Sequence, residues 1–191
     1  MFDSKELAGD LGKYLAYLEL EQGFSGNTII SYKQELEKLA AYLQAKKIGH
    51  LAVSENDMLD FIKEEAIKGI SLATQAHIIS VMKSFYKYLA AEDKIDFNPA
   101  AAIVFPKKWK VLPKYLTIAQ VDSLLDLPDE SKIFGQRDKA ILELMYATGL
   151  RISEAIGLRF DNVYLEENFV RIMGKGSKER IVPLGSKAVQ Y

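Results

Sequence analysis

Apolar residues recur at intervals of three and four through most of the first hundred residues, and this spacing places them on one face of a helix. Four stretches carry the pattern: residues 7–20, 29–43, 58–69 and 78–89. Asn27 or Thr28 is expected to cap the second helix, and Ser54 with Asp57 forms a capping pair for the third. Because the connecting loops are short, the pattern predicts a compact bundle of helices.

The helical period stops at Asn98, because a proline pushes the residue before it out of the α region. Residues 99–115 hold three prolines and four lysines, with no acidic residue and no helical period. Such a stretch is typical of an extended linker. We therefore expect a helical domain over residues 1–98, a linker over 99–115 and a second domain over 116–191.

The second domain is expected to mix helices and strands. Helices are predicted at residues 117–127, at 134–148 and from Arg151 onward, with Gly149 ending the second of them. Ile141, Leu144 and Met145 are expected to face inward. From residue 162 the apolar period changes to two, which predicts three short strands. The fold class is thus mainly α: a helical domain, then an α+β domain with a small three-stranded antiparallel sheet.

The charge of the chain is unevenly distributed. The net charge of −1 argues against a nucleic-acid partner. Yet residues 101–115 carry four lysines and no acid, and residues 171–191 carry five basic residues against one acid. Clusters of this kind matter more for phosphate binding than the sum does. Solvated lysines in a linker and a hairpin explain the pattern equally well at this point.

Composition excludes several classes of site. The chain has no cysteine, so it has no disulfide, thiolate zinc site or cysteine nucleophile, which fits a reducing compartment. The N-terminus lacks a secretory pattern, and no apolar run is long enough for a membrane span. We expect a cytoplasmic protein with no metal, no cofactor and no membrane partner.

Two residues have the chemistry and position to meet an anion, and a third can support one of them. Arg151 follows a helix-ending glycine at the start of the next helix, where its guanidinium and backbone N–H groups can bind a phosphate. Glu154 lies three residues on and can hold the guanidinium in place. Lys175 stands between two glycines at a predicted hairpin tip. An ordinary Arg–Glu pair and a solvated turn lysine are the competing interpretations.

Candidate DNA contacts lie on two helices and in the two basic segments. The fourth helix has a small and polar face opposite its apolar stripe, and the second helix begins with polar residues. The candidates are Thr28, Tyr32, Lys33, Gln75, His77, Lys83, Lys87, Lys107, Lys108, Lys110, Lys178 and Arg180. A plain solvent face remains the alternative for both helices, because neither is strongly basic.

Several segments together resemble one family. The run from Arg137 to Glu154 and the hairpin from Gly174 to Leu184 resemble the catalytic domain of Xer-type members of the tyrosine recombinase (phage integrase) family. The first hundred residues, including residues 27–32, are similar to the SAM-like core-binding domain of that family. Asn98-Pro99 and the Lys/Pro-rich stretch after it fit the same pattern. The resemblance covers nearly the whole chain.

The resemblance implies a site-specific recombinase that cuts and rejoins DNA through a 3′-phosphotyrosyl intermediate without a metal. By position, Arg151 corresponds to the first catalytic arginine, Lys175 to the catalytic lysine and Glu154 to the acidic residue that supports them. The implied partners are double-stranded DNA and further copies of the chain in a tetramer, or a paralogous recombinase.

The family also uses a His-x-x-Arg motif, a further His or Trp and a nucleophilic tyrosine. Neither His50 nor His77 is followed three residues later by arginine, and Tyr191 comes too soon after Lys175 to be the nucleophile. We therefore expect a truncated catalytic domain, in a chain that binds DNA but does not cleave it. The alternative is a short non-catalytic relative that occupies recombination sites. An unrelated helical interaction protein would match residues 137–154 only by chance.

Overall fold

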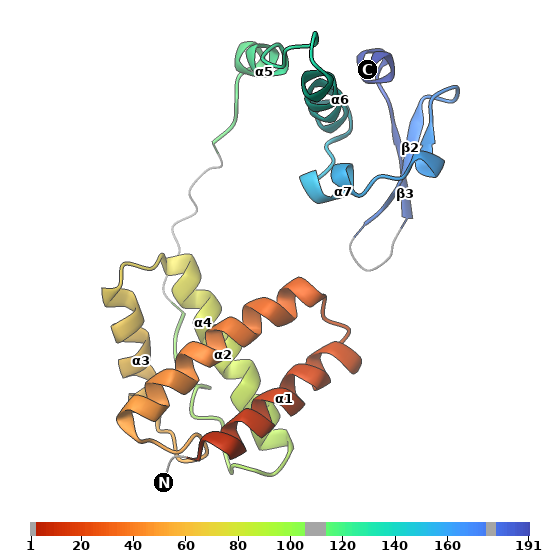
Figure 1. Cartoon of the computed structure of the whole chain (residues 1–191). Helices are drawn as coiled ribbons and strands as arrows, with labels where there is room; N and C mark the ends of the chain where they lie inside the picture. The colour runs from red at the N-terminus through yellow and green to blue at the C-terminus, as the bar shows by residue number, and fades with distance from the viewer. Residues whose placement is uncertain (1–2, 106–113, 175–178) are drawn as a thin grey trace. The chain divides into compact units, whose positions relative to one another are not determined.

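The computed structural model describes residues 3–105, 114–174 and 179–191, and the chain divides into two compact units, Met1–Val111 and Leu112–Tyr191 (Figure 1). Helices are the regular elements in the described part of the first unit, and the second combines helices with one sheet. The predicted fold class, mainly α with a small three-stranded antiparallel sheet, is confirmed.

The described part of the first unit contains four helices: α1 (Ser4–Leu20), α2 (Gly26–Lys46), α3 (Glu55–Ile67) and α4 (Leu72–Ala91). The predicted capping box of α3 is confirmed, since Ser54 and Asp57 bond to each other's backbone N–H groups. The predicted cap of α2 is wrong. Ser25, in an extended conformation, is its N-cap, and Asn27 and Thr28 lie inside the first turn.

Aromatic and aliphatic side chains fill the centre of the bundle. Tyr14 of α1 and Phe85 of α4 are almost fully buried and meet edge to face, with ring centroids 5.3 Å apart. Phe61 brings α3 into the same core. The hydroxyls of Tyr14 and Tyr86 are buried and have no hydrogen-bond partner among the described residues. Apolar packing therefore dominates this core.

The segment that follows α4 packs onto the first unit. Ala100 and Ile103 are 0% and 3% exposed and belong to the core of the bundle. The Asn98 side chain donates to the Lys83 carbonyl at 2.9 Å, and Lys83 Nζ donates to the Ala101 carbonyl at 3.0 Å. We name residues 98–105 the strap. The strap thus belongs to the first unit, although its sequence has no helical period.

A buried carboxylate connects three further parts of the first unit. Asp10 of α1 is 3% exposed. Its Oδ2 lies 2.9 Å from Nε2 of His50, which precedes α3 and is itself buried, and its Oδ1 accepts a hydrogen bond from Lys94, which follows α4. Three segments far apart in the sequence therefore meet at one charge.

The second unit contains short helices and a meander. Its elements are α5 (Ile118–Leu125), α6 (Ile133–Thr148), α7 (Ile152–Ile156), the 3-10 helix η1 (Phe160–Asn162), β1 (Val163–Tyr164), β2 (Phe169–Met173), β3 (Glu179–Pro183) and α8 (Ser186–Gln190). The strands are antiparallel in the order β1-β2-β3. In β2 and β3, Val170 pairs with Val182 and Ile172 with Arg180. Gly149 ends α6 in the left-handed region at φ 63°, as predicted.

A small core joins the sheet to α6. Leu150, Val170, Ile172 and Leu184 are buried together, and Leu144 packs against them. The expectation that Ile141 and Met145 also face inward is only partly met, since both are half-buried. The buried side chains of α6 are instead Lys139 and Glu143. Lys139 Nζ donates to the Leu125 carbonyl at 2.9 Å and pairs with Glu143 at 3.4 Å, so the ammonium group fastens α6 to the end of α5.

Candidate functional site

A tight turn between α6 and α7 presents Arg151. Gly149 adopts the left-handed conformation that ends α6, and Leu150 then enters the core with 4% of its surface exposed. The Thr148 hydroxyl bonds back to the Leu144 carbonyl and accepts the Leu150 N–H at 3.4 Å. Arg151 comes next as the N-cap of α7, with 73% of its side chain exposed. A buried leucine thus anchors the turn that carries the exposed guanidinium.

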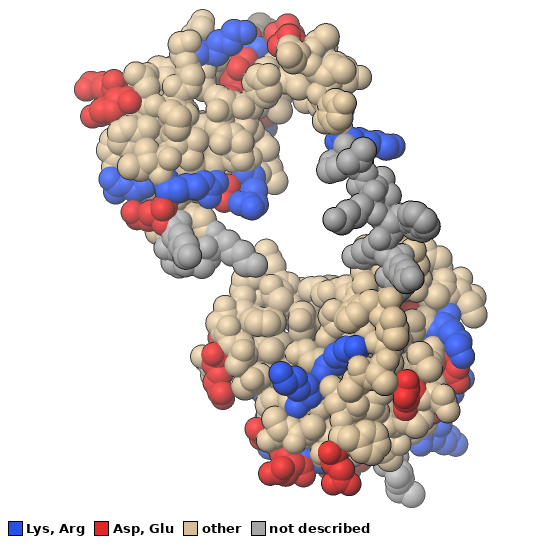
Figure 2. All heavy atoms as spheres, turned by 180° about the vertical axis from the view of Figure 1, so that it is seen from behind, with Lys and Arg blue, Asp and Glu red and all other residues tan. Residues whose placement is uncertain are grey.

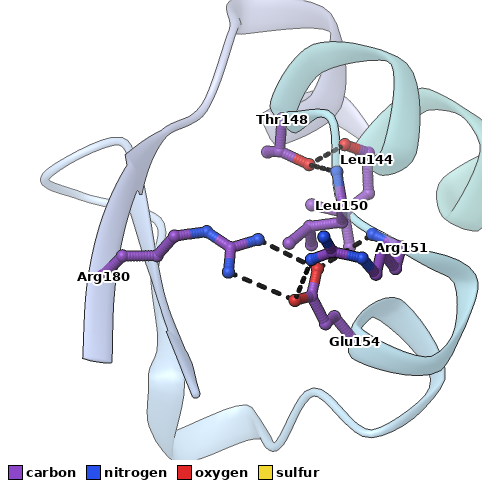
Figure 3. A network of polar contacts seen from close by, with 6 residues as sticks. All are labelled: Leu144, Thr148, Leu150, Arg151, Glu154 and Arg180. Atoms are coloured by element: carbon purple, nitrogen blue, oxygen red, sulfur yellow. Dashed lines mark hydrogen bonds and ion pairs between the residues drawn. The ribbon is translucent and has the colours of Figure 1, made fainter. Parts of the chain in front are cut away.

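Glu154 joins two arginines from different parts of the second unit (Figure 3). Its Oε2 accepts the Arg151 backbone N–H at 2.9 Å, and its Oε1 accepts Arg151 Nη1 at 3.1 Å. Arg180 of β3 approaches the same carboxylate with both terminal nitrogens, Nη1 to Oε1 at 3.1 Å and Nη2 to Oε2 at 2.9 Å. The predicted Arg151–Glu154 contact is therefore present, and Arg180 is an additional partner.

The surroundings of Glu154 keep it ionised. The hydrogen bonds from Arg180, followed by the Arg151 backbone N–H, lower the pKa of this carboxyl to about 2, against the opposing effect of burial. The carboxylate is 9% exposed. At any pH near neutrality the site therefore contains two guanidinium groups and one carboxylate, and its net charge is positive.

Other basic side chains lie near the same sheet. Arg171 of β2 lies opposite Ile181, and its guanidinium lies 5.3 Å from the ring centre of Tyr164. Arg171 and Arg180 both line an open hollow of about 570 Å³. On the face seen in Figure 2, basic side chains gather along one edge of the second unit, whereas both charges are interspersed on the first. The basic count of residues 171–191 was the only sequence signal for Arg171.

The two helices proposed to grip DNA meet in the first unit. Ser31 Oγ of α2 lies 2.9 Å from His77 Nε2 of α4, and the rings of Tyr32 and His77 meet edge to face with centroids 5.9 Å apart. Phe24 also meets the Tyr32 ring edge to face, with ring centroids 5.7 Å apart. The start of α2 and the first half of α4 thus form one surface. Ser31, which bridges them, was not singled out from the sequence.

The remaining candidates of the first unit have varied surroundings. Lys87 and Lys33 are exposed, and Lys33 lies 3.8 Å from Glu37. Thr28 Oγ1 lies 2.9 Å from Ser25 Oγ. Gln75 Nε2 donates to the Ile70 carbonyl at 3.4 Å. Lys83, besides its bond to the strap, lies 4.8 Å from the ring centre of Phe105. Among the candidates in the described part of the first unit, Lys33 and Lys87 thus present ammonium groups with little restraint.

Five candidates lie outside the described residues: Lys107, Lys108, Lys110, Lys175 and Lys178. Across the described ranges, no cluster of three or more His, Asp or Glu side chains is placed to hold a metal ion. No helix in those ranges is long and apolar enough to cross a membrane.

Family comparison agrees with this architecture. Residues 114–191 match the phage integrase family, and residues 11–93 match the phage integrase N-terminal SAM-like domain. The chain belongs to the phage integrase family. The resemblance seen in the sequence is thereby confirmed, and it extends over both units.

Relatives in this family include the tyrosine recombinases XerD of Staphylococcus haemolyticus and of Chlorobaculum tepidum. The first is 38% identical over 188 residues, with 94% of this chain and 61% of the relative covered. The second is 41% identical over 184 residues, with 95% of this chain and 60% of the relative covered. The chain therefore spans about three-fifths of the length of these relatives.

Solved structures of phage integrase family members share the fold. A lambda integrase dimer bound to a COC′ core site is 18% identical, with a TM-score of 0.75 over 96% of this chain and 64% of that one. The XerH site-specific recombinase bound to a palindromic difH substrate is 19% identical, with a TM-score of 0.72 over 96% of this chain and 66% of that one. At these identities the likeness concerns the fold.

Proposed function

We propose that this chain is the DNA-gripping domain and the first part of the catalytic domain of a site-specific tyrosine recombinase. The observation that carries the proposal is the exposed Arg151 guanidinium, anchored by Glu154 beside Arg180 in a net positive cluster. The XerD relatives, at 38% and 41% identity, supply the reaction class. The substrate is double-stranded DNA, and the protein works in the cytoplasm.

The proposed chemistry assigns two roles. A tyrosine oxygen attacks a DNA phosphodiester, the bond to the 5′ oxygen breaks, and a 3′-phosphotyrosyl link forms. Negative charge grows on the non-bridging oxygens, where the Arg151 guanidinium stabilises it. Lys175 gives a proton to the leaving 5′ oxygen as general acid. The 191-residue chain contains no His-x-x-Arg motif, and we propose that alone it binds DNA without cutting it.

We also propose the surface that grips DNA and the assembly that acts on it. The surface where α2 meets α4, with Lys33 and Lys87, contacts the duplex, and the linker lysines 107, 108 and 110 and hairpin Lys178 add contacts to phosphate. A lambda integrase of the same fold is described as a tetramer bound to a Holliday junction. This supports self-association on DNA, with itself or with a paralogous recombinase. A non-catalytic DNA-binding protein is the second candidate.

The test uses Arg151→Ala and Lys175→Ala in the longer recombinase to which we assign this chain. Both changes should slow formation of the covalent complex, Arg151→Ala by on the order of a hundredfold or more, because a fork on a developing dianion is lost. A substrate with a 5′-bridging sulfur needs no proton on its leaving group. It should therefore rescue Lys175→Ala far more than Arg151→Ala.

Covalent complex is measured on both substrates with both variants, and duplex binding is measured for the 191-residue chain at several salt concentrations. Binding should weaken as salt rises, because phosphate contacts release counterions. Equal rescue of the two variants would remove the general-acid role from Lys175. A longer protein that binds recombination sites but never forms the covalent complex would favour the non-catalytic candidate.

A further inference from the structure

Arg180 is held in a fork rather than turned toward solvent. Both of its terminal nitrogens bond to Glu154, at 3.1 and 2.9 Å, and 39% of its side chain is exposed, compared with 73% for Arg151 (Figure 3). Parallel hydrogen bonds of this kind fix a guanidinium in orientation as well as position. A phosphate contact needs free donors, and two of the five N–H donors of Arg180 are already taken by Glu154.

The strand explains why Arg180 points at Glu154. Alternate residues of a strand share a face, so Arg180 lies on the same side of β3 as Val182. Val182 packs against the core that contains Leu150, the residue before Arg151. On the neighbouring strand Arg180 pairs with Ile172, which is 3% exposed. The Arg180 side chain therefore extends from a strand that packs on the core toward the turn that carries Arg151.

The carboxylate of Glu154 has no acceptor site left for a further hydrogen bond. A carboxylate accepts about four hydrogen bonds, and Glu154 accepts four: two from Arg180, one from the Arg151 guanidinium and one from the Arg151 backbone. Arg151 consequently meets Glu154 through Nη1 alone, and its other N–H groups bond to no residue in the described part of the chain. Four donors of one guanidinium thus remain for an anion.

Removing Arg180 would change how the two arginines share the acceptor sites of Glu154. Glu154 would have two vacant acceptor sites beside Arg151, and an arginine and a carboxylate prefer to meet through two parallel bonds. Arg151 would then turn more of its donors inward, and the cluster would fall from a net charge of +1 to zero. Both effects weaken binding of an anion at Arg151.

We propose that Arg180 is a positioning residue, which occupies Glu154 so that Arg151 keeps its donors and a positive cluster available to a DNA phosphate. The inference rests on the proposed function for its ligand and differs from a direct contact between Arg180 and DNA. It makes a distinctive prediction: once Arg180 is lost, removing the charge of Glu154 should restore part of the function.

The first experiment needs no DNA. In the 191-residue chain labelled with ¹⁵N, the guanidinium N–H signals of Arg180 should exchange with water more slowly than those of Arg159. That residue is the matched control, since it reaches its carboxylate partner Asp161 only at 3.6 Å, with both side chains largely exposed. Glu154→Gln should abolish the difference. Arg180 signals that exchange as fast as those of Arg159 would overturn the proposal.

The second experiment is a double-mutant cycle on the affinity of the same chain for a mixed-sequence DNA duplex. Arg180→Gln should weaken binding, and Glu154→Gln should restore affinity in that background by about threefold more than it raises it in the wild type. The pair Arg159→Gln and Asp161→Asn should give additive effects within about twofold. Additive effects at Arg180 and Glu154 would mean direct DNA contact and would overturn the positioning role.

Thermal unfolding of Arg180→Gln, Glu154→Gln and the double variant distinguishes a purely structural role from a positioning role. The proposal is wrong if the DNA affinity of each variant falls in proportion to its loss of folded protein and the double variant regains no affinity over Arg180→Gln. If the wild-type chain binds no duplex even at low salt, the proposed function fails. The exchange rates of Arg180 then still show whether the fork on Glu154 exists.

Discussion

Gly135 lies at a position where any side chain would collide with the backbone of a neighbouring turn. It lies in the first turn of α6, where an added Cβ would stand 2.0 Å from the Asp129 carbonyl oxygen and 2.5 Å from its carbon. Both are backbone atoms, so no side-chain rotation relieves the contact. The preceding turn is also tied, since the Lys132 N–H donates to the same carbonyl at 3.0 Å. The backbone itself would have to move.

Gly135→Ala should therefore lower the free energy of unfolding of the second unit by about 1–3 kcal/mol, the usual cost of forcing extra volume into a packed place. Gly12→Ala is the control, because Gly12 lies inside α1 with nothing near its Cβ position. It should raise the stability of the first unit by about 0.5–1 kcal/mol. Urea unfolding, followed through the amide signals of each unit, measures both. Similar effects of the two changes would contradict the close contact.

The sequence predicted one of the two contacts that arginines make with Glu154. Arg151 and Glu154 are three residues apart at a helix start, so local spacing was enough to place them together. Arg180 lies 26 residues after Glu154, and its position depends on the register of β3 and on how the sheet packs. The available signal was the strand alternation, which places Arg180 on the same face of β3 as Val182. A basic residue on the packed side of a strand indicates a buried partner.

At the scale of elements, Asp10 joins three segments of the first unit through its contacts with His50 and Lys94. Burial by itself would raise the pKa of Asp10, but hydrogen bonds from His50 and Lys94 outweigh it and hold the pKa below the usual 3.8. The ionised form of Asp10 therefore stabilises the folded state relative to the unfolded state. Its contribution is present above the unfolded-state pKa of 3.8 and is lost as the pH falls through the lower folded-state pKa.

Asp10→Asn should lower the free energy of unfolding of the first unit by about 2 kcal/mol at pH 7, since two hydrogen bonds to a charged acceptor are weakened. It should also flatten the decline of stability below pH 4. Asp96→Asn, at an exposed position two residues after Lys94, is the control and should change neither. Denaturant unfolding at a series of pH values measures the effect. An unchanged acid limb in Asp10→Asn would refute the assignment.

Helix existence was more predictable than helix surroundings. The apolar stripes, together with the capping pair of Ser54 and Asp57, were sufficient to place four helices. The start of α2 was missed because several polar residues stand in a row from Ser25, and only the backbone conformation selects one. The burial of Lys139 and Glu143 was missed because charge in a helix normally indicates solvent. Here each satisfies the other, together with a carbonyl of α5.

At the scale of the whole molecule, the strap sets where the first domain ends. Ala100 and Ile103 are buried in the helical core, so we propose a boundary after residue 105 rather than at 98. The sequence could not indicate this, because two apolar residues in an irregular segment have no period. The contacts that hold them come from α4, through Lys83 and Asn98.

Two neighbouring residues test the boundary. Ile103 is 3% exposed and Val104 is 85% exposed. Ile103→Ala should lower the free energy of unfolding of the first unit by about 2–4 kcal/mol, whereas Val104→Ala should change it by less than about 0.5 kcal/mol. Neither should alter the second unit. Residue-resolved hydrogen exchange reports both units in one sample. Equal, small effects of the two changes would return the boundary to residue 98.

The strap also sets an order of events during synthesis. The described members of the first core all lie between Leu7 and Ile103, so this core is complete once Ile103 has left the ribosome. About 80 further residues separate Ile103 from Arg180, and at ordinary rates of translation they take roughly 4–16 s to add. A small helical domain folds in microseconds to milliseconds. The first unit is therefore folded on the nascent chain before Glu154 can meet its second arginine.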